Sequence, residues 1–287
     1  MSHPFDSQAE LMCLYWTSSG VFPGEGEVSR FSFRERVEAA SKAGFRGIGI
    51  WHSDLEHTLE QMTLPEMKRI LDANGMAYLE LEFLTDWFVD GPERSTSDAR
   101  RRCLLTASEG LGASHIKVGD FANTPCSMEQ ATEAFADLCE DAADHGARIA
   151  FEFMASAMID NLDDALTLVD TVGAPNGGLA VDIAHVVGQG IPYSDVASIP
   201  LAGLFSVELN DGFLAGSPNH DASRPRAFCG EGEYDVQGFV RSARASGYRG
   251  PWAVEVFSKE LSGLPLDVLN ARAFASTARV LEAASLP

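Results

Sequence analysis

Four short apolar runs in the second half of the chain each end in an acidic residue. They are Ile149–Glu152, Leu179–Asp182, Phe205–Glu208 and Trp252–Glu255. Short apolar runs that are bounded by Gly and Pro fit buried parallel strands. A carboxylate inside such a run is costly unless another group pairs with it. Four acids at equivalent places suggest one shared partner, and a divalent cation is the simplest candidate.

Strands and helices alternate along the chain. Besides the four acidic runs, strands are expected at Met12–Tyr15, Ile48–Trp51, Tyr78–Phe83 and Ser114–Val118. Helices are expected at 32–44, 64–74, 97–110, 127–145, 161–172, 236–246 and 265–284, with a short segment at 192–198 in place of a long sixth helix.

This alternation predicts an α/β fold with a parallel sheet. Eight repeats over 287 residues predict a single (β/α)8 TIM barrel that spans residues 1–287 as one domain. An open, doubly wound sheet is the alternative. Such a sheet normally carries a Gly-rich phosphate loop after its first strand, and the stretch Gly20–Gly26 does not match one.

The charge balance limits the partners that the chain can bind. The formal net charge is −21, from 42 acidic and 21 basic residues, so most of the surface repels nucleic acid and anionic membranes. No apolar stretch reaches the roughly 18 residues of a membrane span, and the N-terminus does not resemble a secretory signal. The five cysteines lie far apart without a CxxC pair, which favours a reducing compartment. We therefore expect a cytoplasmic protein with a small-molecule substrate.

In a TIM barrel the carboxyl ends of the strands form the active face. Glu152, Asp182, Glu208 and Glu255 would converge there from four neighbouring strands. Oxygen ligands suit Mn²⁺, Mg²⁺ or Co²⁺ better than a structural zinc site. One divalent ion offsets only half of four carboxylate charges, so one carboxyl is expected to stay protonated or to lie outside the coordination sphere.

The order of these motifs resembles the sugar phosphate isomerase/epimerase superfamily, the xylose isomerase-like TIM barrels that also include endonuclease IV. The resemblance rests on AGFRGIGIW, IAFEFM, VDIAHVVGQG, VELNDG, CGEGEYD and WAVEVFS, which span nearly the whole chain. It implies one divalent metal ion bound by Glu152, Asp182, Glu208 and Glu255. Glu208 stands where the resemblance leads us to expect His, and this harder ligand set should favour Mg²⁺ or Mn²⁺ over zinc.

Several other residues are candidates for contacts with a substrate. His185 follows Asp182 by three residues; a lone His is more often structural, but the resemblance implies that this one faces the substrate. Arg224 and Arg226, with the nearby Glu231, belong either to a solvated loop or to a clamp on substrate oxygens.

Lys117 lies inside the fourth strand, where its side chain must pair with an acid or point into the barrel mouth. There it would either form an ion pair with Asp120 or Glu82, or polarise a carbonyl and stabilise an oxyanion. His52 and Trp51 follow the second strand, and with Trp16 and Trp87 they could line the pocket. Aromatic residues at strand ends are more often packing residues, although sugar-like rings do stack on them.

The resemblance implies a sugar, keto-polyol or related hydroxy-carbonyl substrate. Glu152 or Glu255 would remove a proton next to a metal-polarised carbonyl, and His185 would serve as the acid. Return of the proton gives isomerisation or epimerisation, which we expect, whereas loss of a hydroxyl gives dehydration of an inosose-like or dehydroshikimate-like compound. A non-catalytic sugar-binding barrel is a further alternative. Endonuclease-like cleavage is disfavoured by the acidic charge, and self-association is common among barrels of this kind.

Overall fold

The computed structural model describes residues 9–221 and 223–285, and these contain eight parallel strands that close into a barrel in sequence order. The strands are β1 Leu11–Cys13, β2 Gly47–Trp51, β3 Tyr78–Leu84, β4 His115–Val118, β5 Ile149–Glu152, β6 Gly177–Asp182, β7 Leu204–Leu209 and β8 Trp252–Val254. β1 pairs with both β2 and β8, so no strand edge is left open among the described residues. The predicted (β/α)8 fold is confirmed.

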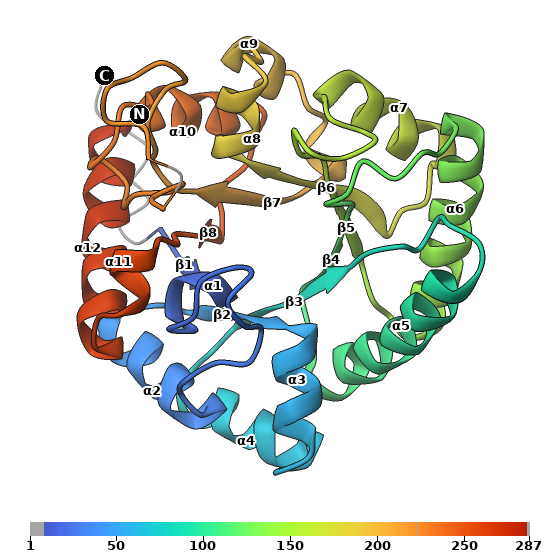
Figure 1. Ribbon diagram of the computed structural model, residues 1–287, viewed down its shortest axis with the longest axis horizontal. Helices are drawn as coiled ribbons and strands as arrows, with labels where there is room; N and C mark the ends of the chain where they lie inside the picture. The colour runs from blue at the N-terminus through green and yellow to red at the C-terminus, as the bar shows by residue number, and fades with distance from the viewer. Residues whose placement is uncertain (1–8, 222, 286–287) are drawn as a thin grey trace, which may run out of the picture.

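Helices surround the barrel (Figure 1). The longer ones are α2 Phe33–Ala43, α4 Leu64–Ala73, α5 Pro92–Leu111, α6 Met128–Asp144, α7 Leu162–Val172, α10 Val236–Ala245 and α12 Leu266–Ala283. Short helices are α1 Tyr15–Ser18, α3 His52–Leu59, α8 Ile183–Gly188, α9 Tyr193–Val196 and α11 Lys259–Ser262, with a 3₁₀ turn at Leu201–Gly203. Within the described ranges, none of these helices is both long enough and apolar enough to cross a membrane.

Most helix boundaries follow local signals in the sequence. Ser32 and Glu35 form the expected capping box at the start of α2, and Gly44 ends that helix with a φ of 112°. Several elements differ from the prediction. The short helices α1, α8 and α11 were not expected, and Tyr15 begins α1 instead of ending the first strand. α5 begins at Pro92, five residues before the expected start, because proline is well suited to the first turn. α3 was not predicted, since it begins directly after β2 without a loop.

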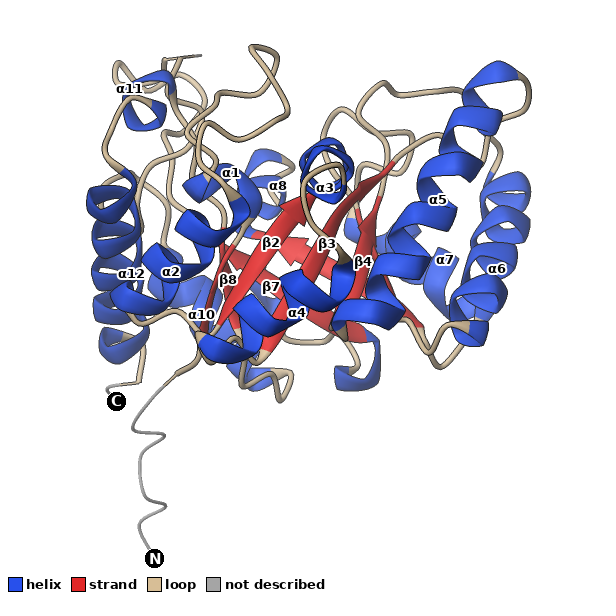
Figure 2. Ribbon diagram, turned by 90° about the horizontal axis from the view of Figure 1, so that it is seen from below, coloured by secondary structure: helices blue, strands red, loops and turns tan. Residues whose placement is uncertain are grey.

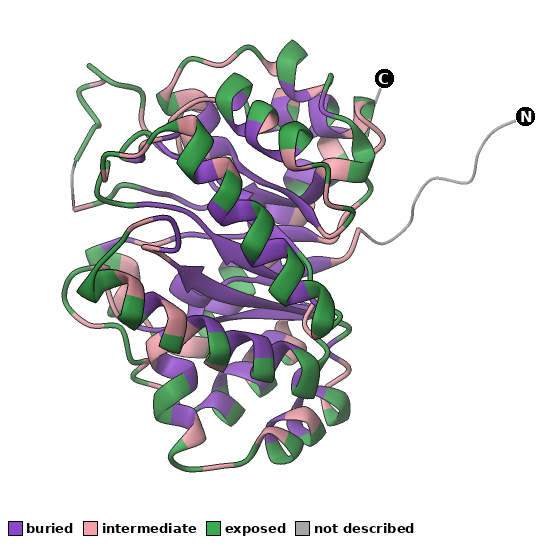
Figure 3. Ribbon diagram, turned by 90° about the vertical axis from the view of Figure 1, so that its right-hand side faces the viewer, coloured by how far each residue is buried: buried purple, intermediate pink, exposed green. Residues whose placement is uncertain are grey.

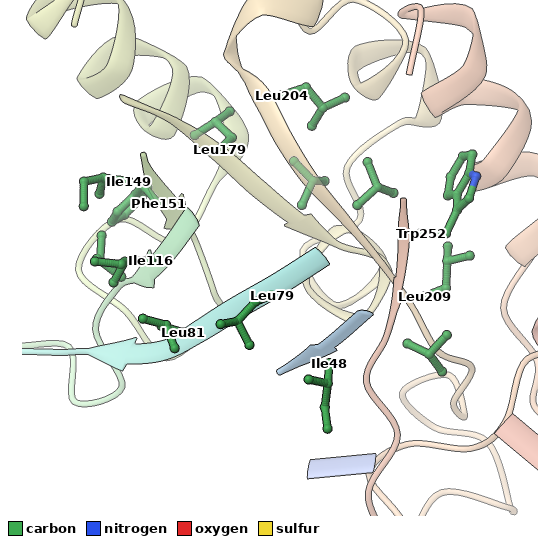
Figure 4. Packing of buried hydrophobic residues seen from close by; sticks show 14 of the residues in the cluster. Ile48, Leu79, Leu81, Ile116, Ile149, Phe151, Leu179, Leu204, Leu209 and Trp252 are labelled. Atoms are coloured by element: carbon green, nitrogen blue, oxygen red, sulfur yellow. The ribbon is translucent and has the colours of Figure 1, made fainter. Parts of the chain in front are cut away.

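The apolar core lies between the barrel and the helices. Outward-facing strand residues such as Leu79, Leu81, Ile116 and Leu179 pack there (Figure 4). In Figure 3 the strands are buried, while the helices are exposed only on their outer faces. The helices therefore cover an apolar outer surface of the barrel, and this packing supplies most of the driving force for folding.

The inner surface of the barrel is charged near the carboxyl ends of the strands. Side chains alternate along β3, so Glu80 and Glu82 point inward between the outward-facing leucines, and both are fully buried. Gly49 of β2 makes room for this layer, because a Cβ atom there would lie 2.1 Å from Glu82 Oε1. The strands end at the same edge as helices α3, α8 and α11 (Figure 2). The charged layer therefore lies beneath the face of the barrel at which these strands end.

Candidate metal and substrate site

A cavity of about 380 Å³ lies at the carboxyl ends of the strands. Its charged and polar lining includes Glu82, Lys117, Glu152, His185, Arg226 and Glu255. Its aromatic lining includes Trp16, Trp51, Phe83, Phe121 and Phe257. The volume suits a small-molecule ligand.

The four predicted metal ligands converge beside this cavity. Asp182, Glu208 and Glu255 each offer one oxygen within 4.8 Å of the others, and all three are buried. Glu152 and His185 form a second such group with Asp182. β6 and β7 are in register at Asp182 and Glu208, which places these two side chains next to each other.

The donor atoms of this group fit a divalent cation. Asp182 Oδ1 accepts hydrogen bonds from the Ala184 backbone N–H at 2.7 Å and from Asn210 Nδ2 at 2.8 Å, which fixes the carboxylate. Glu208 Oε2 is buried and accepts no hydrogen bond from any described residue, whereas the partner of Asp182 Oδ2 is the Arg226 guanidinium. Buried carboxylate oxygens without such a partner are costly, and a bound cation would satisfy them.

Two cationic side chains, Lys117 and Arg226, lie among these acids. Lys117 Nζ donates to Glu208 Oε1 at 2.9 Å. Arg226 Nη1 lies 2.8 Å from Asp182 Oδ2 and also pairs with the Glu255 carboxylate. Because Lys117 and Arg226 are both buried, their charges act at low dielectric. They still leave an excess of carboxylates.

Burial and the neighbouring charges shift the pKa values of these acids. Burial is the main cause that raises the pKa of Glu82, Glu208 and Glu255 above the ordinary value of 4.5. Burial also opposes ionisation of Glu152, but the Lys117 ammonium and other cations outweigh it and lower the pKa of Glu152 to about 2. Glu152 is thus ionised at neutral pH, while the others favour a proton or a metal ion.

An aromatic wall also lines the cavity and comprises Trp16, Trp51, Phe83, Phe121 and Phe257. The Trp16 and Trp51 ring centroids are 5.0 Å apart, and those of Phe83 and Phe121 are 4.6 Å apart. Phe121 is 47% exposed at the edge of the cavity. Such a wall offers an apolar surface to one face of a bound ring.

Some of the predicted substrate-binding residues line the cavity, and others do not. Trp51 and Arg226 line the cavity. His52 is buried behind it with its Nε2 3.8 Å from Glu27 Oε2, and burial lowers the pKa of His52 to about 4. Arg224 is exposed beside Phe213, outside the cavity lining.

Three further residues lie elsewhere than expected. Glu231 is exposed and pairs with Arg272 at 3.1 Å, away from the cavity. Lys117 pairs with Glu82 at 3.6 Å, but its other expected partner, Asp120, instead accepts backbone hydrogen bonds that shape the following loop. Trp87 packs against the helices rather than in the cavity.

The sequence did not reveal Phe83, Phe121 and Phe257 as wall residues. Phe83 breaks the alternation of β3, because the register between β3 and β4 shifts between Leu81 and Leu84. Phe121 and Phe257 lie in loops, where no periodic pattern predicts direction.

The sequence matches the model of the family described as xylose isomerase-like TIM barrel over residues 37–283. The closed barrel agrees with this match, which covers most of the chain. The chain belongs to the xylose isomerase-like TIM barrel family. The predicted resemblance is confirmed.

Curated relatives carry the names of different enzymes. The chain is 28% identical over 236 residues to a 3-dehydroshikimate dehydratase of Pseudomonas aeruginosa, which covers 80% of this chain but only 37% of the dehydratase. It is 23% identical over 245 residues to an inosose isomerase of Halalkalibacterium halodurans, which covers 78% of this chain and 82% of the isomerase. The chain thus spans little more than a third of the dehydratase that it matches.

Solved structures share the fold. A structure of an IolI protein with a bound zinc atom superposes with a TM-score of 0.84 at 18% identity, and the match covers 96% of this chain and all of that one. A D-psicose 3-epimerase structure has a TM-score of 0.71 at 15% identity, covering 95% and 99% of the two chains. At these identities the likeness concerns the barrel alone.

Proposed function

We propose that the protein is a divalent-metal-dependent isomerase or epimerase that acts on a sugar, keto-polyol or related hydroxy-carbonyl compound. The observation that carries the proposal is the convergence of Glu152, Asp182, Glu208 and Glu255 in two ligand groups that share Asp182, where the buried Glu208 Oε2 has no donor among the described residues. The named isomerase relative supports the reaction class.

The four carboxylates would hold one Mn²⁺ or Mg²⁺ ion, with Co²⁺ as a further fit for an oxygen-rich site. When bound, such an ion supplies Lewis acidity that polarises a substrate carbonyl. Arg226 keeps Glu255 in place, and Asn210 does the same for Asp182. The ligands are therefore held before any substrate enters.

Glu152 is suited to move the substrate proton. Its carboxylate is ionised at neutral pH, it lines the cavity, and its Oε1 lies 3.4 Å from His185 Nε2. Glu152 would accept a proton from the carbon next to the carbonyl, and His185 would donate to the adjacent oxygen. Glu255 is the second candidate base on the opposite side of the ligand group. Lys117 would place a positive charge near the negative charge that develops on the substrate.

The test is metal content together with turnover. We expect about one Mn²⁺, Mg²⁺ or Co²⁺ per chain in the wild type, and an affinity weakened by about 100-fold or more in Glu208→Ala and Glu255→Ala. Glu231→Ala is the matched control, since it removes an exposed glutamate outside the cavity. A wild type that stays metal-free after reconstitution would refute the proposed function.

A lyase is the second candidate, because the dehydratase relative matches 80% of the chain. Proton removal is the same first step, but loss of a β-hydroxyl then forms a conjugated product. Reaction of an inosose and of 3-dehydroshikimate in D₂O separates the two. Solvent deuterium in an isomeric product supports the isomerase, whereas release of water with a new ultraviolet absorbance supports the lyase.

A further inference from the structure

Lys117 of β4 ends inside a cage of carboxylates at the centre of the barrel. Its Nζ lies closest to Glu208 Oε1, at 2.9 Å, and to Glu80 Oε1, at 3.2 Å. The further oxygens are Glu82 Oε2 at 3.6 Å, Glu152 Oε2 at 3.6 Å and Glu255 Oε1 at 3.7 Å. An ammonium has only three N–H donors, so it cannot bond to all of these acceptors. The cage has the layout of a cation site rather than that of one ion pair.

Two members of the cage, Glu80 and Glu82, are outside the proposed set of metal ligands. Each is fully buried and fixed through one oxygen. Glu80 Oε2 lies 2.5 Å from His115 Nε2, and Glu82 Oε1 accepts from the Tyr15 backbone N–H at 3.1 Å. The other oxygens, Glu80 Oε1 and Glu82 Oε2, face Lys117 and form no hydrogen bond with the described parts of the chain.

This arrangement does not depend on the ammonium for its shape. Glu80 and Glu82 are anchored by groups other than Lys117, and each presents its second oxygen to the centre of the cage. Glu208 differs, because its Oε1 accepts from Lys117 and its buried Oε2 has no donor among the described residues, so one of its oxygens is already free for a cation. Removal of the ammonium would leave several preformed carboxylate oxygens around one point, which suits a hard cation.

We propose that the Lys117 ammonium is a tethered cation that fills a second cation site next to the divalent-metal site. The protein then holds one divalent ion where its carboxylates alone would hold two. The inference rests on the proposed function for the neighbouring metal site. Lys117 lines the cavity, so its positive charge can also interact with a substrate oxygen. Unlike a metal ion, this charge is covalently attached and cannot dissociate.

The experiment counts metal ions in wild type and in Lys117→Ala, after both are loaded with Mn²⁺ and passed through a desalting column. We expect about one more Mn²⁺ per chain in K117A than in wild type, and a larger rise of Tm on addition of Mn²⁺. Lys68→Ala is the matched control, because Lys68 forms an exposed ion pair with Asp72 on the surface of α4. K68A should match the wild type in both measurements.

K117A is expected to need the added ion in order to fold, since it loses a buried positive charge. If it does not accumulate as folded protein, Lys117→Ala/Glu80→Gln removes one charge of each sign and is measured in the same way. An extra Mn²⁺ in either variant supports the tethered cation. Equal metal counts in wild type and in the folded variant overturn it.

The metal counts test the tethered cation and the proposed function independently. A wild type without metal and a K117A variant with one Mn²⁺ would support the tethered cation and refute the proposed metal-dependent chemistry. One Mn²⁺ in both proteins would overturn the tethered cation and leave the proposed metal site standing.

Discussion

The two sides of the cavity are built in different ways. The acidic side comes from side chains at or just beyond the ends of β3 to β8, which are buried and held by hydrogen bonds or ion pairs. The aromatic wall comes partly from loops, and Phe121 is about half exposed. Residues on strands are held more rigidly than residues on loops. The comparison indicates that the chemistry depends on the acidic side and the fit of the substrate on the aromatic wall.

Loss of the proposed base should have the largest effect. Glu152→Gln keeps the shape of the side chain but removes the charge that faces His185. We expect turnover at saturating Mn²⁺ to fall by about 10²–10⁴-fold. The measurement is kcat on the substrate that a screen of ketoses and inososes returns. A kcat close to that of the wild type would assign the proton transfer to Glu255 instead.

Arg226→Met tests whether the acidic side needs its cations for stability. This change leaves Asp182 and Glu255 without their guanidinium partner, so the metal-free protein should lose about 3–5 kcal/mol of unfolding free energy. Bound Mn²⁺ should recover a large part of this loss. Denaturant titration with and without Mn²⁺ measures both values.

Arg272→Met is the control for this pair, because Arg272 forms an exposed ion pair with Glu231. Its effect should stay within about 0.5 kcal/mol, with or without metal. If bound Mn²⁺ does not reduce the loss of unfolding free energy in R226M, the ion does not bind to the carboxylates that Arg226 contacts.

The pH dependence of stability gives the next test. Glu82, Glu208 and Glu255 have raised pKa values, so above pH 4.5 the native state binds more protons than the unfolded state, and stability falls as pH rises. Glu152, with a pKa lowered to about 2, acts in the opposite sense, and its contribution is lost as pH falls from 4.5 toward 2.

His52, whose pKa burial lowers to about 4, opposes this trend below pH 6.5, but it is one group against three. The metal-free protein should therefore be more stable at pH 6 than at pH 8, and saturating Mn²⁺ should reduce or reverse this difference. Thermal unfolding at the two pH values, with and without metal, measures it. The same slope in both forms would indicate that the ion does not bind at these acids.

The aromatic wall should give the smallest effect. Phe121→Ala removes a half-exposed ring that would pack against a bound substrate, and such a ring contact is worth about 0.5–1.5 kcal/mol, or about 2- to 10-fold in KM. We expect kcat to change little. Leu214→Ala is the control, since Leu214 is 46% exposed and does not line the cavity. A large fall in kcat for F121A would remove the distinction between the two sides.

Much of the fold could be predicted from the sequence because its signals are local. Alternating apolar runs and helix caps, such as Ser32 with Glu35, determine the elements, and eight repeats determine the barrel. The convergence of Asp182 and Glu208 followed from their places at strand ends. The α3 helix was missed because it begins at His52 without a loop or a cap signal.

The details of the site depend on contacts across the barrel, which one sequence does not contain. Lys117 reaches across the barrel interior to Glu208, 91 positions further along the chain. Arg226 lies in the cavity and Arg224 outside it. Ala227 pairs with Asp211 and draws Arg226 against the barrel, whereas Arg224 remains in the exposed part of the loop.

The charged layer inside the barrel bears on how this protein can evolve. Gly49 has no side chain where Glu82 lies, so charged side chains fill this part of the barrel interior. Buried ionic groups are often less stabilising than apolar groups of the same volume. Proteins commonly give up stability where activity requires it. Because the helices pack on the other surface of the strands, the interior can acquire new chemistry while the architecture remains the same.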